Sequence, residues 1–578
     1  MGSLFLIYIE LKNYLFNLKK NKSIDMKKII LFISFLIGCN GNYNDEKKFS
    51  DFVESFNSKS DNLTFNVDRL SEDVILQQLS ETKEKLKILR TIDINALEKE
   101  TKVDYKFIES ILVGKEIDLE EIQSWKKDPR DYMNFRQISN NYNSRMACEE
   151  KYDYLLEHLP VVLNDLKFAM VQIDSYVPRF QELGLYMAEN SMSIFSHDIS
   201  ELTYSCQENR DWVEDPRADK IDSLNKEIIL QLELFIDFLK NELPNKEKSS
   251  FFIGKETYNK MLKNQFLLDY NDETLWEFGW KEFNNTLDKM DALAKEINPD
   301  KTTQDILVDI KNEYPHPDSM IQAHQYWVDK SGEHIKSNNL IPIPWKERVN
   351  VVPREEYLRK TSYYGNFSRS RGVDDEGYFT SEWKINPFEH QWDQKTKDEY
   401  LVEHDWGVIL VTAPHETYAG HHIQGLYQMH NPKELRRNNG LSLFSEGWGL
   451  YNEQLMLETG FYPNKKIKLR QLQLRLWRNA RVIYDVGMHT GKLSYEDAIS
   501  LMTDKVGFLR WAAQLEIDSS SSRPGYFIGY FMGMIEILEM REDYKKMKGE
   551  NYNISDFHEK LLKIGNMPPS IMREALFN

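Results

Sequence analysis

The chain has 578 residues, 41% of them hydrophobic, which is enough to build a packed core and excludes a disordered polypeptide. Its formal net charge of −18 argues against nucleic acid as a partner, because binding to phosphates requires a basic surface. Only 26 glycines occur among many Leu, Lys, Glu and Met residues, so we expect a mainly α protein.

The N-terminal segment predicts export. We leave residues 1–25 out of the fold as a non-native or misassigned start. From Met26 the chain reads MKKIILFISFLIGCNGNYND, with two lysines, an apolar run too short to span a bilayer, and then Gly38 and Cys39. This arrangement resembles a bacterial lipobox, in which signal peptide 26–38 is removed and Cys39 is lipidated. We therefore expect an exported, membrane-anchored bacterial lipoprotein of the periplasm or cell surface; the alternative is an N-terminal membrane anchor or a buried helix.

Residues 39–62 are polar and rich in Asn, Asp, Ser and Lys, which is typical of a flexible tether. Successive helical patterns follow over an N-terminal helical region, 63–330. With Cys39 lipidated, Cys148 and Cys206 are the two cysteines left, and they could form one disulfide outside the cytosol.

Residues 340–400 change in character, because Pro, Gly and aromatic residues interrupt short alternating runs. This pattern predicts loops with a few short strands. Helical periodicity resumes near residue 397 and continues almost to the end, as in KLRQLQLRLWRNARVIYDVGMH. We assign 331–578 as the region that carries the chemistry.

The segment APHETYAGHHIQ carries the strongest chemical signal. It begins like the zinc-peptidase motif H-E-x-x-H, with His415 and Glu416, but the next histidines are His421 and His422. On an undistorted helix His421 lies roughly 120° away from the face of His415, whereas His422 returns to that face about 10 Å further along. A shared metal ion therefore requires a bulge or break, for which Ala419 and Gly420 are the most permissive residues.

A third ligand is expected from a following helix. The segment LSLFSEGWGLYNEQLMLE offers Glu446, with Gly447 and Gly449 allowing close packing of the backbone. Glu446 stands among apolar residues, where a carboxylate is costly unless it is paired or bound to metal. Two imidazoles and a carboxylate suit Zn²⁺.

Four segments together resemble one bacterial family: HETYAGHHIQ, SEGWGLYNE, RNARVIYDVGMH and PGYFIGYFMGMIEILEMRE. The family is domain of unknown function 885, many of whose members look like exported lipoproteins, and it resembles the gluzincin zinc peptidases, including the Taq-type carboxypeptidases. The resemblance implies a multi-helix, zincin-like metallopeptidase architecture with a few short strands near the active-site cleft. It also favours His421 over His422 as the second ligand.

The resemblance implies roles for four further residues. Asp485 and His489 match a family motif and are expected to orient the ligands or contact substrate, with His489 assisting catalysis. Arg481, four residues before Asp485, is expected to pair with it, and the alternative is a simple ion pair on the helix surface. Tyr530 matches a family tyrosine that could stabilise an oxyanion. The chain departs from its relatives at the four serines 519–522, which follow Glu516-Ile517-Asp518 where many relatives have Arg-Tyr.

These observations predict a zinc-dependent peptidase in which Glu416 is the general base for a metal-activated water. By analogy, region 63–330 forms the other wall of the cleft and the partner is a peptide substrate. Two alternatives stay open: a non-catalytic lipoprotein that keeps the fold as a binding module, and a metal hydrolase of non-peptide amides or esters.

Overall fold

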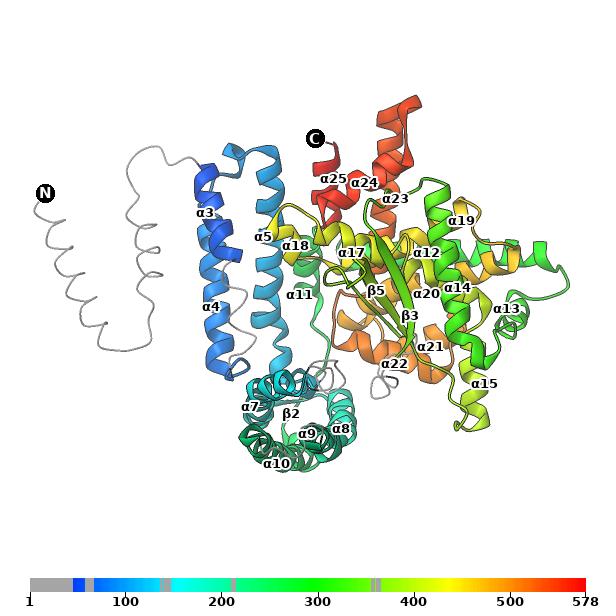
Figure 1. Ribbon diagram of the computed structural model, residues 1–578. Coiled ribbons are helices and arrows are strands. Elements are labelled where there is room, and N and C mark those ends of the chain that lie inside the picture. Colours follow the sequence, from blue (N-terminus) through cyan, green and yellow to red (C-terminus); the bar gives the residue numbers. More distant parts are fainter. Residues whose placement is uncertain are drawn as a thin grey trace, which may run out of the picture.

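The structure is a computed structural model that describes residues 45–57, 67–135, 138, 147–208, 215–354, 359 and 365–577. The predicted signal peptide 26–38, Cys39 and residues 1–25 lie outside the described residues. Within them the protein is mainly helical with two small sheets, which confirms the predicted fold class at that level (Figure 1). No described helix is both long and apolar enough to cross a membrane.

Among the helices up to residue 337, those before residue 240 form two groups. The helices up to residue 337 are α3 (Asp45–Asn57), α4 (Glu72–Leu89), α5 (Lys99–Ile117), α7 (Cys148–Gln172), α8 (Pro178–Ser193), α9 (Ile199–Glu208), α10 (Pro216–Asp237), α11 (Lys255–Lys260), α12 (Asp272–Ile297), α13 (Thr303–Lys311) and α14 (Met320–Ser337). Helices α4 and α5 pack together and α3 contacts both, through Phe56 with Lys85 and Phe49 with Tyr105, while α7 to α10 gather at one end of this group (Figure 1).

The predicted tether 39–62 is wrong over residues 45–57, which form α3. Phe49 and Phe52 lie one turn apart on this helix and are both buried, and the Phe49 ring lies 5.9 Å from that of Tyr105 in α5. Two aromatic side chains at helical spacing bury enough apolar surface to hold an otherwise polar segment in place.

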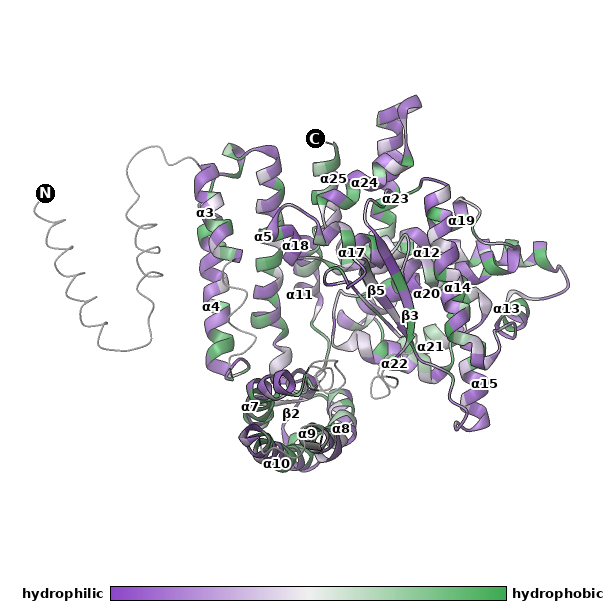
Figure 2. Cartoon of the chain, viewed as in Figure 1, coloured by the Kyte–Doolittle hydropathy of each residue, from purple (hydrophilic) through white to green (hydrophobic). Residues whose placement is uncertain are grey.

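The structure has two hydrophobic cores, and the boundary between them does not match the predicted region boundary at residue 330. One core is confined to residues between Ile75 and Leu243, whereas the larger one runs from Phe49 to Met572 and so joins both halves of the chain. The smaller core is closed by a disulfide between Cys148 of α7 and Cys206 of α9, the two cysteines that the sequence could not show to meet. Hydrophobic and hydrophilic residues alternate along the helices, as expected for helices with one buried face (Figure 2).

A three-stranded sheet stands beside the candidate site, in the region where short strands were predicted. It consists of β3 (Glu347–Pro353), β4 (Asn366–Ser368) and β5 (Phe379–Ile385). The order is β3-β5-β4, with β3 parallel and β4 antiparallel to β5. A second, two-stranded parallel sheet pairs β1 (Ser175–Tyr176) with β2 (Glu247–Lys248).

Helices of the C-terminal half carry the candidate site. They are α15 (Gln394–Glu403), α16 (Trp406–Glu416), α17 (His421–Met429), α18 (Glu434–Asn438), α19 (Ser442–Glu458), α20 (Lys465–His489), α21 (Tyr495–Ser500), α22 (Arg510–Ser521), α23 (Ile528–Lys548), α24 (Ile554–Ile564) and α25 (Pro569–Phe577). Helices α19 and α23 pack backbone to backbone, since a Cβ atom on Gly447 would lie 2.5 Å from the Cα atom of Gly533. This bears out the close packing expected at Gly447.

Candidate metal centre

The lengthened histidine motif breaks its helix where the sequence predicted a break. Helix α16 ends at Glu416, and α17 begins at His421. Between them Ala419 adopts a φ of 81°, in the left-handed region that non-glycine residues rarely occupy. At Gly420 a Cβ atom would lie 1.7 Å from the carbonyl oxygen of His415, so only glycine fits there.

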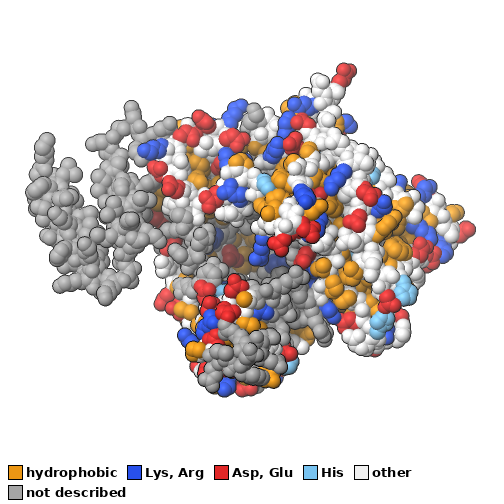
Figure 3. All heavy atoms as spheres, in the orientation of Figure 1, with side chains coloured by type: hydrophobic (Ala, Val, Ile, Leu, Met, Phe, Trp, Pro, Cys, Tyr) orange, Lys and Arg blue, Asp and Glu red, His pale blue; other side chains and the backbone are white. Residues whose placement is uncertain are grey.

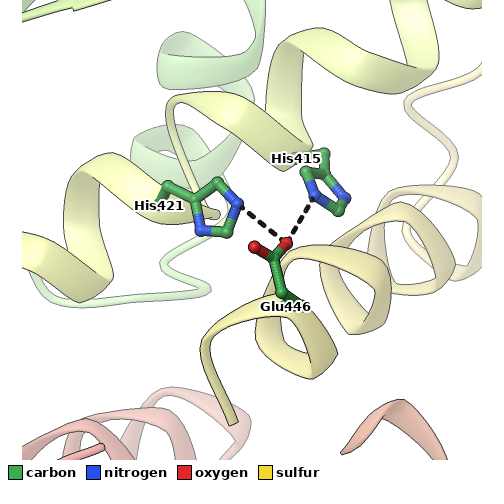
Figure 4. A group of neighbouring side chains, drawn as sticks. All are labelled: His415, His421 and Glu446. Carbon is green, nitrogen blue, oxygen red and sulfur yellow. Dashed lines mark ion pairs between the residues drawn. The ribbon is translucent and has the colours of Figure 1, made fainter. Parts of the chain in front are cut away.

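The break brings His421 to the same point as His415 and Glu446 (Figure 4). The Nε2 atoms of His415 and His421 lie 3.8 and 3.4 Å from Oε2 of Glu446. One donor atom from each residue falls within 4.8 Å of the other two, a separation compatible with a shared ion. Two imidazoles and one carboxylate are the donor set of many catalytic zinc sites, so the chemistry of the three residues fits zinc.

Space for the His415 ring comes from a glycine on the neighbouring helix. A Cβ atom on Gly449 of α19 would lie 2.7 Å from the Nε2 atom of His415. Because His415 is buried, its ring could not move aside for a larger residue. Gly449 therefore permits the imidazole to reach Glu446 on the same helix, a more specific role than the backbone packing expected from the sequence.

Glu453 is a site residue that the sequence reasoning missed. Its Oε1 atom lies 2.9 Å from Nδ1 of His415, and Arg478 contacts the same carboxylate oxygen at 3.3 Å. A carboxylate on one ring nitrogen fixes the tautomer and aims the other nitrogen at the shared point. The available signal was spacing, because Glu453 follows Glu446 by two helical turns and shares its face.

The charge environment of the three residues favours a cation. Burial alone would lower the pKa of His415, but hydrogen bonds to Glu446 and Glu453 raise it to about 9. Burial would likewise raise the pKa of Glu446, yet the neighbouring histidines hold it well below its usual value. The cluster therefore stabilises a positive charge at its centre.

His422, the alternative ligand, points elsewhere. Its Nδ1 atom lies 2.9 Å from Oγ of Ser381 and its Nε2 atom lies 2.9 Å from Oε2 of Glu347. Both ring nitrogens are therefore engaged with the sheet and not with His415. The structure groups His421, and not His422, with the other two residues.

A cavity of about 620 Å³ opens beside the cluster. Glu416, Tyr526 and Tyr530 line it together with the three candidate ligands. The Tyr526 hydroxyl donates to Oε1 of Glu446 at 3.0 Å, a contact that the sequence reasoning missed by choosing Tyr530 alone. The Tyr530 ring stands nearly parallel to that of His415 at 6.4 Å, so the predicted tyrosine is also close to the cluster.

The described residues that line the cavity all lie between Arg354 and Tyr530. Region 63–330, which we expected to form the other wall, contributes none of them. The sheet and helices α16, α17, α19, α20, α22 and α23 surround the cavity instead.

Three predicted neighbours of the centre lie differently. Arg481 does not pair with Asp485, because its Nε atom donates to Oε1 of Glu516 at 2.6 Å. Asp485 accepts hydrogen bonds from the Tyr258 hydroxyl at 2.6 Å and the Gly525 backbone N–H at 2.9 Å. The buried His489 ring lies 3.2 Å from a backbone oxygen at residue 520. Neither Asp485 nor His489 is among the described residues lining the cavity, so the structure does not bring them to the candidate ligands.

Residues 518–520, in the segment where we expected a departure from the family pattern, contact neighbouring helices and the cavity. Asp518 forms an ion pair with Arg179 at 2.5 Å and accepts from the Tyr495 hydroxyl at 2.6 Å. Ser520 donates to Oδ2 of Asp485 at 3.4 Å, and Ser519 lines the cavity. Asp518 and Ser520 thus fasten α22 to its neighbours at the edge of the candidate site.

Asp485 gives a prediction about pH. Burial raises the pKa of Asp485 from 3.8 to about 7. Between pH 3.8 and pH 7 the folded protein therefore keeps this proton while the unfolded chain has lost it, so the free energy of unfolding falls as the pH rises. Asp485→Asn keeps the acceptor but cannot ionise, so its midpoint of thermal unfolding at pH 8 should equal or exceed that of the wild type. At pH 5 this advantage should shrink. Asp485→Ala should lower the midpoint at both pH values; equal pH dependence in the wild type and Asp485→Asn would contradict the prediction.

Comparisons with known proteins assign the chain to a family but give it no activity. A family model described as "Bacterial protein of unknown function (DUF885)" matches residues 61–576, which confirms the family predicted from the motifs. No curated protein matches the sequence.

Two of the solved structures that share the fold are described as lipoproteins. A "putative lipoprotein of unknown function" from Shewanella oneidensis aligns with a TM-score of 0.76 and 18% identity, covering 93% of this chain and all of that one. A "putative lipoprotein" from Colwellia psychrerythraea aligns with a TM-score of 0.69 and 17% identity, covering 92% of this chain and 96% of that one. At these identities the likeness extends to the fold alone.

Proposed function

This chain belongs to the DUF885 family of bacterial proteins, and within that family we propose that it is a zinc-dependent hydrolase that cleaves peptide bonds. The observation that carries the proposal is the grouping of His415, His421 and Glu446, whose donor atoms lie within 4.8 Å of one another beside a cavity. The gluzincin-like architecture remains part of this proposal.

The three residues would hold Zn²⁺ through two imidazole nitrogens and one carboxylate oxygen. When bound there, zinc supplies a Lewis acid that lowers the pKa of a water molecule toward about 7. Glu453 and Arg478 keep His415 in the tautomer that presents Nε2 to the ion. Before an ion is bound, the neighbouring histidines hold the pKa of Glu446 well below its usual value, so its carboxylate is already ionised.

The remaining steps fall to residues on the cavity wall. Glu416, next to His415 at the end of α16, takes a proton from the attacking water and passes it to the leaving amine. The phenol of Tyr530 stands on the same wall and would donate a hydrogen bond to the oxygen that becomes negative when the carbonyl is attacked. Tyr526 donates its hydroxyl hydrogen to Glu446 instead, so its role is to orient that ligand.

The decisive experiment combines metal analysis with peptide hydrolysis. We expect the purified protein to hold about one zinc ion and to cleave members of a mixed peptide library. Treatment with a chelator should remove both the metal and the activity, and added zinc should restore them. A metal-free protein, or one that holds zinc but cleaves only a panel of esters, would overturn the peptidase proposal.

Glu453 provides a test of how the centre is built. Glu453→Gln retains the size of the side chain but replaces the anionic partner of His415 with a neutral one. We expect zinc affinity to fall by about 10- to 100-fold, as measured by competition with a chromogenic chelator. Glu458→Gln, a change near the exposed end of the same helix, serves as a control and should leave zinc affinity unchanged. Equal zinc affinity in Glu453→Gln and the wild type would refute the orienting role.

We also propose that the protein acts at a bacterial membrane surface, held there by a lipid on Cys39. The lipobox-like sequence and the lipoprotein descriptions of the two structural neighbours support this placement. After cell fractionation we expect the wild-type protein in the membrane fraction and the Cys39→Ala variant in the soluble fraction. Retention of Cys39→Ala in the membrane fraction would contradict the proposal.

A further inference from the structure

The cavity beside the metal centre is rich in arginine, although the protein as a whole is acidic with a net charge of −18. The arginines on its wall are Arg354, Arg369, Arg478, Arg481 and Arg523. Acidic and basic side chains are interspersed over the face of the molecule seen in Figure 3. Five guanidinium groups around one cavity are therefore a local feature, and they would attract an anionic ligand.

Two of these arginines are neutralised by buried glutamates. Arg478 contacts Glu453 at 3.3 Å, and Arg481 contacts Glu516 at 2.6 Å. Both arginines are buried. Their charges are balanced within the protein, so they support the ligand-bearing helices and leave little charge for a ligand.

Arg369 and Arg523 are different because both are exposed and contact neutral groups. Arg369 donates from Nη1 to Oε1 of Gln428 at 2.9 Å, and Arg523 donates from Nε to the backbone oxygen of Ser519 at 3.3 Å. In the part of the chain that the structure describes, neither arginine forms an ion pair with a carboxylate. Among the described residues, each therefore offers the cavity a guanidinium that is not paired directly with a carboxylate.

The two arginines stand beside different parts of the metal centre. Arg369 follows β4 and packs against α17, the helix that begins at His421, where a Cβ atom on Gly425 would lie 3.3 Å from its Cδ atom. The guanidinium of Arg523 lies 4.6 Å from the ring centroid of Tyr526, which holds Glu446. A ligand in the cavity can therefore contact Arg369 on the side of His421 and Arg523 on the side of Glu446.

We propose that Arg369 and Arg523 bind a carboxylate of the substrate and make the enzyme selective for peptides with an anionic group next to the scissile bond. The proposal rests on the proposed peptidase function and specifies its substrate class. A guanidinium binds a carboxylate through two parallel hydrogen bonds, which adds direction to the charge attraction. In a peptide that carboxylate is either the free C-terminus or an Asp or Glu side chain.

Binding without turnover tests the proposal. The probes are three N-acetylated alanine-based tetrapeptides: one with a free C-terminal carboxylate, one amidated, and one amidated with an internal Glu. Their affinities are measured by calorimetry with full-length, zinc-supplemented Glu416→Gln protein. We expect at least one carboxylate-bearing probe to bind about 10-fold more tightly than the neutral amide, with the difference shrinking at high salt. The free-acid probe identifies a C-terminal site, and the Glu probe identifies a side-chain site.

Arginine variants complete the test. Arg369→Gln and Arg523→Gln, each added to Glu416→Gln, should reduce the preference for the carboxylate. The matched control is Arg371→Gln, because Arg371 is exposed in the same segment but does not line the cavity. Equal affinity for all three probes would overturn the proposal. So would a loss of carboxylate preference in Arg371→Gln as large as that in Arg369→Gln and Arg523→Gln. Because turnover is not measured, failure of the wild type to cleave peptides would count against the proposed function alone.

Discussion

Glu416→Gln is expected to abolish peptide hydrolysis while leaving zinc in place. Glu416 ends α16 immediately after His415 and lines the cavity, but it is not one of the three residues grouped around the shared point. Glutamine has the same size and cannot accept the proton, so kcat should fall by about 10²- to 10⁴-fold. Cleavage of a peptide library by the wild type and the variant, followed by mass spectrometry, measures the effect.

Zinc content separates this result from unfolding. The variant should bind about one zinc ion and melt at the same temperature as the wild type, because the metal-binding side chains are unchanged. Loss of zinc together with activity would instead assign Glu416 to the metal shell. Unchanged turnover would remove it from the mechanism, and the absence of turnover in the wild type would favour the binding-module alternative.

Local geometry explains in part why the grouping of His415, His421 and Glu446 could be predicted from sequence. The arithmetic of 3.6 residues per turn shows that an unbroken helix cannot direct His415 and His421 to one point, and Ala419-Gly420 is where the helix ends. Glu446 was predicted because a lone carboxylate among apolar residues needs a partner. The preference for His421 over His422 came from the family resemblance, because the helix arithmetic alone left both residues open.

Contacts between distant segments explain what the sequence could not give. Spacing puts Arg481 and Asp485 on one face of α20, but it does not say which helix packs on that face. Glu516 of α22 is the partner of Arg481, whereas the Tyr258 hydroxyl donates to Asp485. Hydrogen bonds of this kind between groups far apart in the chain have no signature in a single sequence.

The same reasoning applies to His489, which was chosen from a motif. It occupies the end of α20, where burial lowers its pKa to about 4. A buried neutral histidine beside a backbone oxygen serves packing more readily than catalysis. Only the three-dimensional arrangement distinguishes it from His415, which is equally buried but faces two carboxylates.

The adjacent residues His421 and His422 give the sharpest test of the metal centre. His421→Gln removes an imidazole that lies 3.4 Å from Glu446, so zinc affinity should fall by at least ~100-fold and hydrolysis should be lost. His422→Gln changes a histidine held by Ser381 and Glu347, so it should keep zinc and retain activity in the folded fraction, although it lowers the melting temperature. Zinc titration of both variants after size-exclusion chromatography measures the difference. The reverse order of affinities would show that the motif closes on His422, because the two substitutions are chemically identical and only the direction of each ring differs.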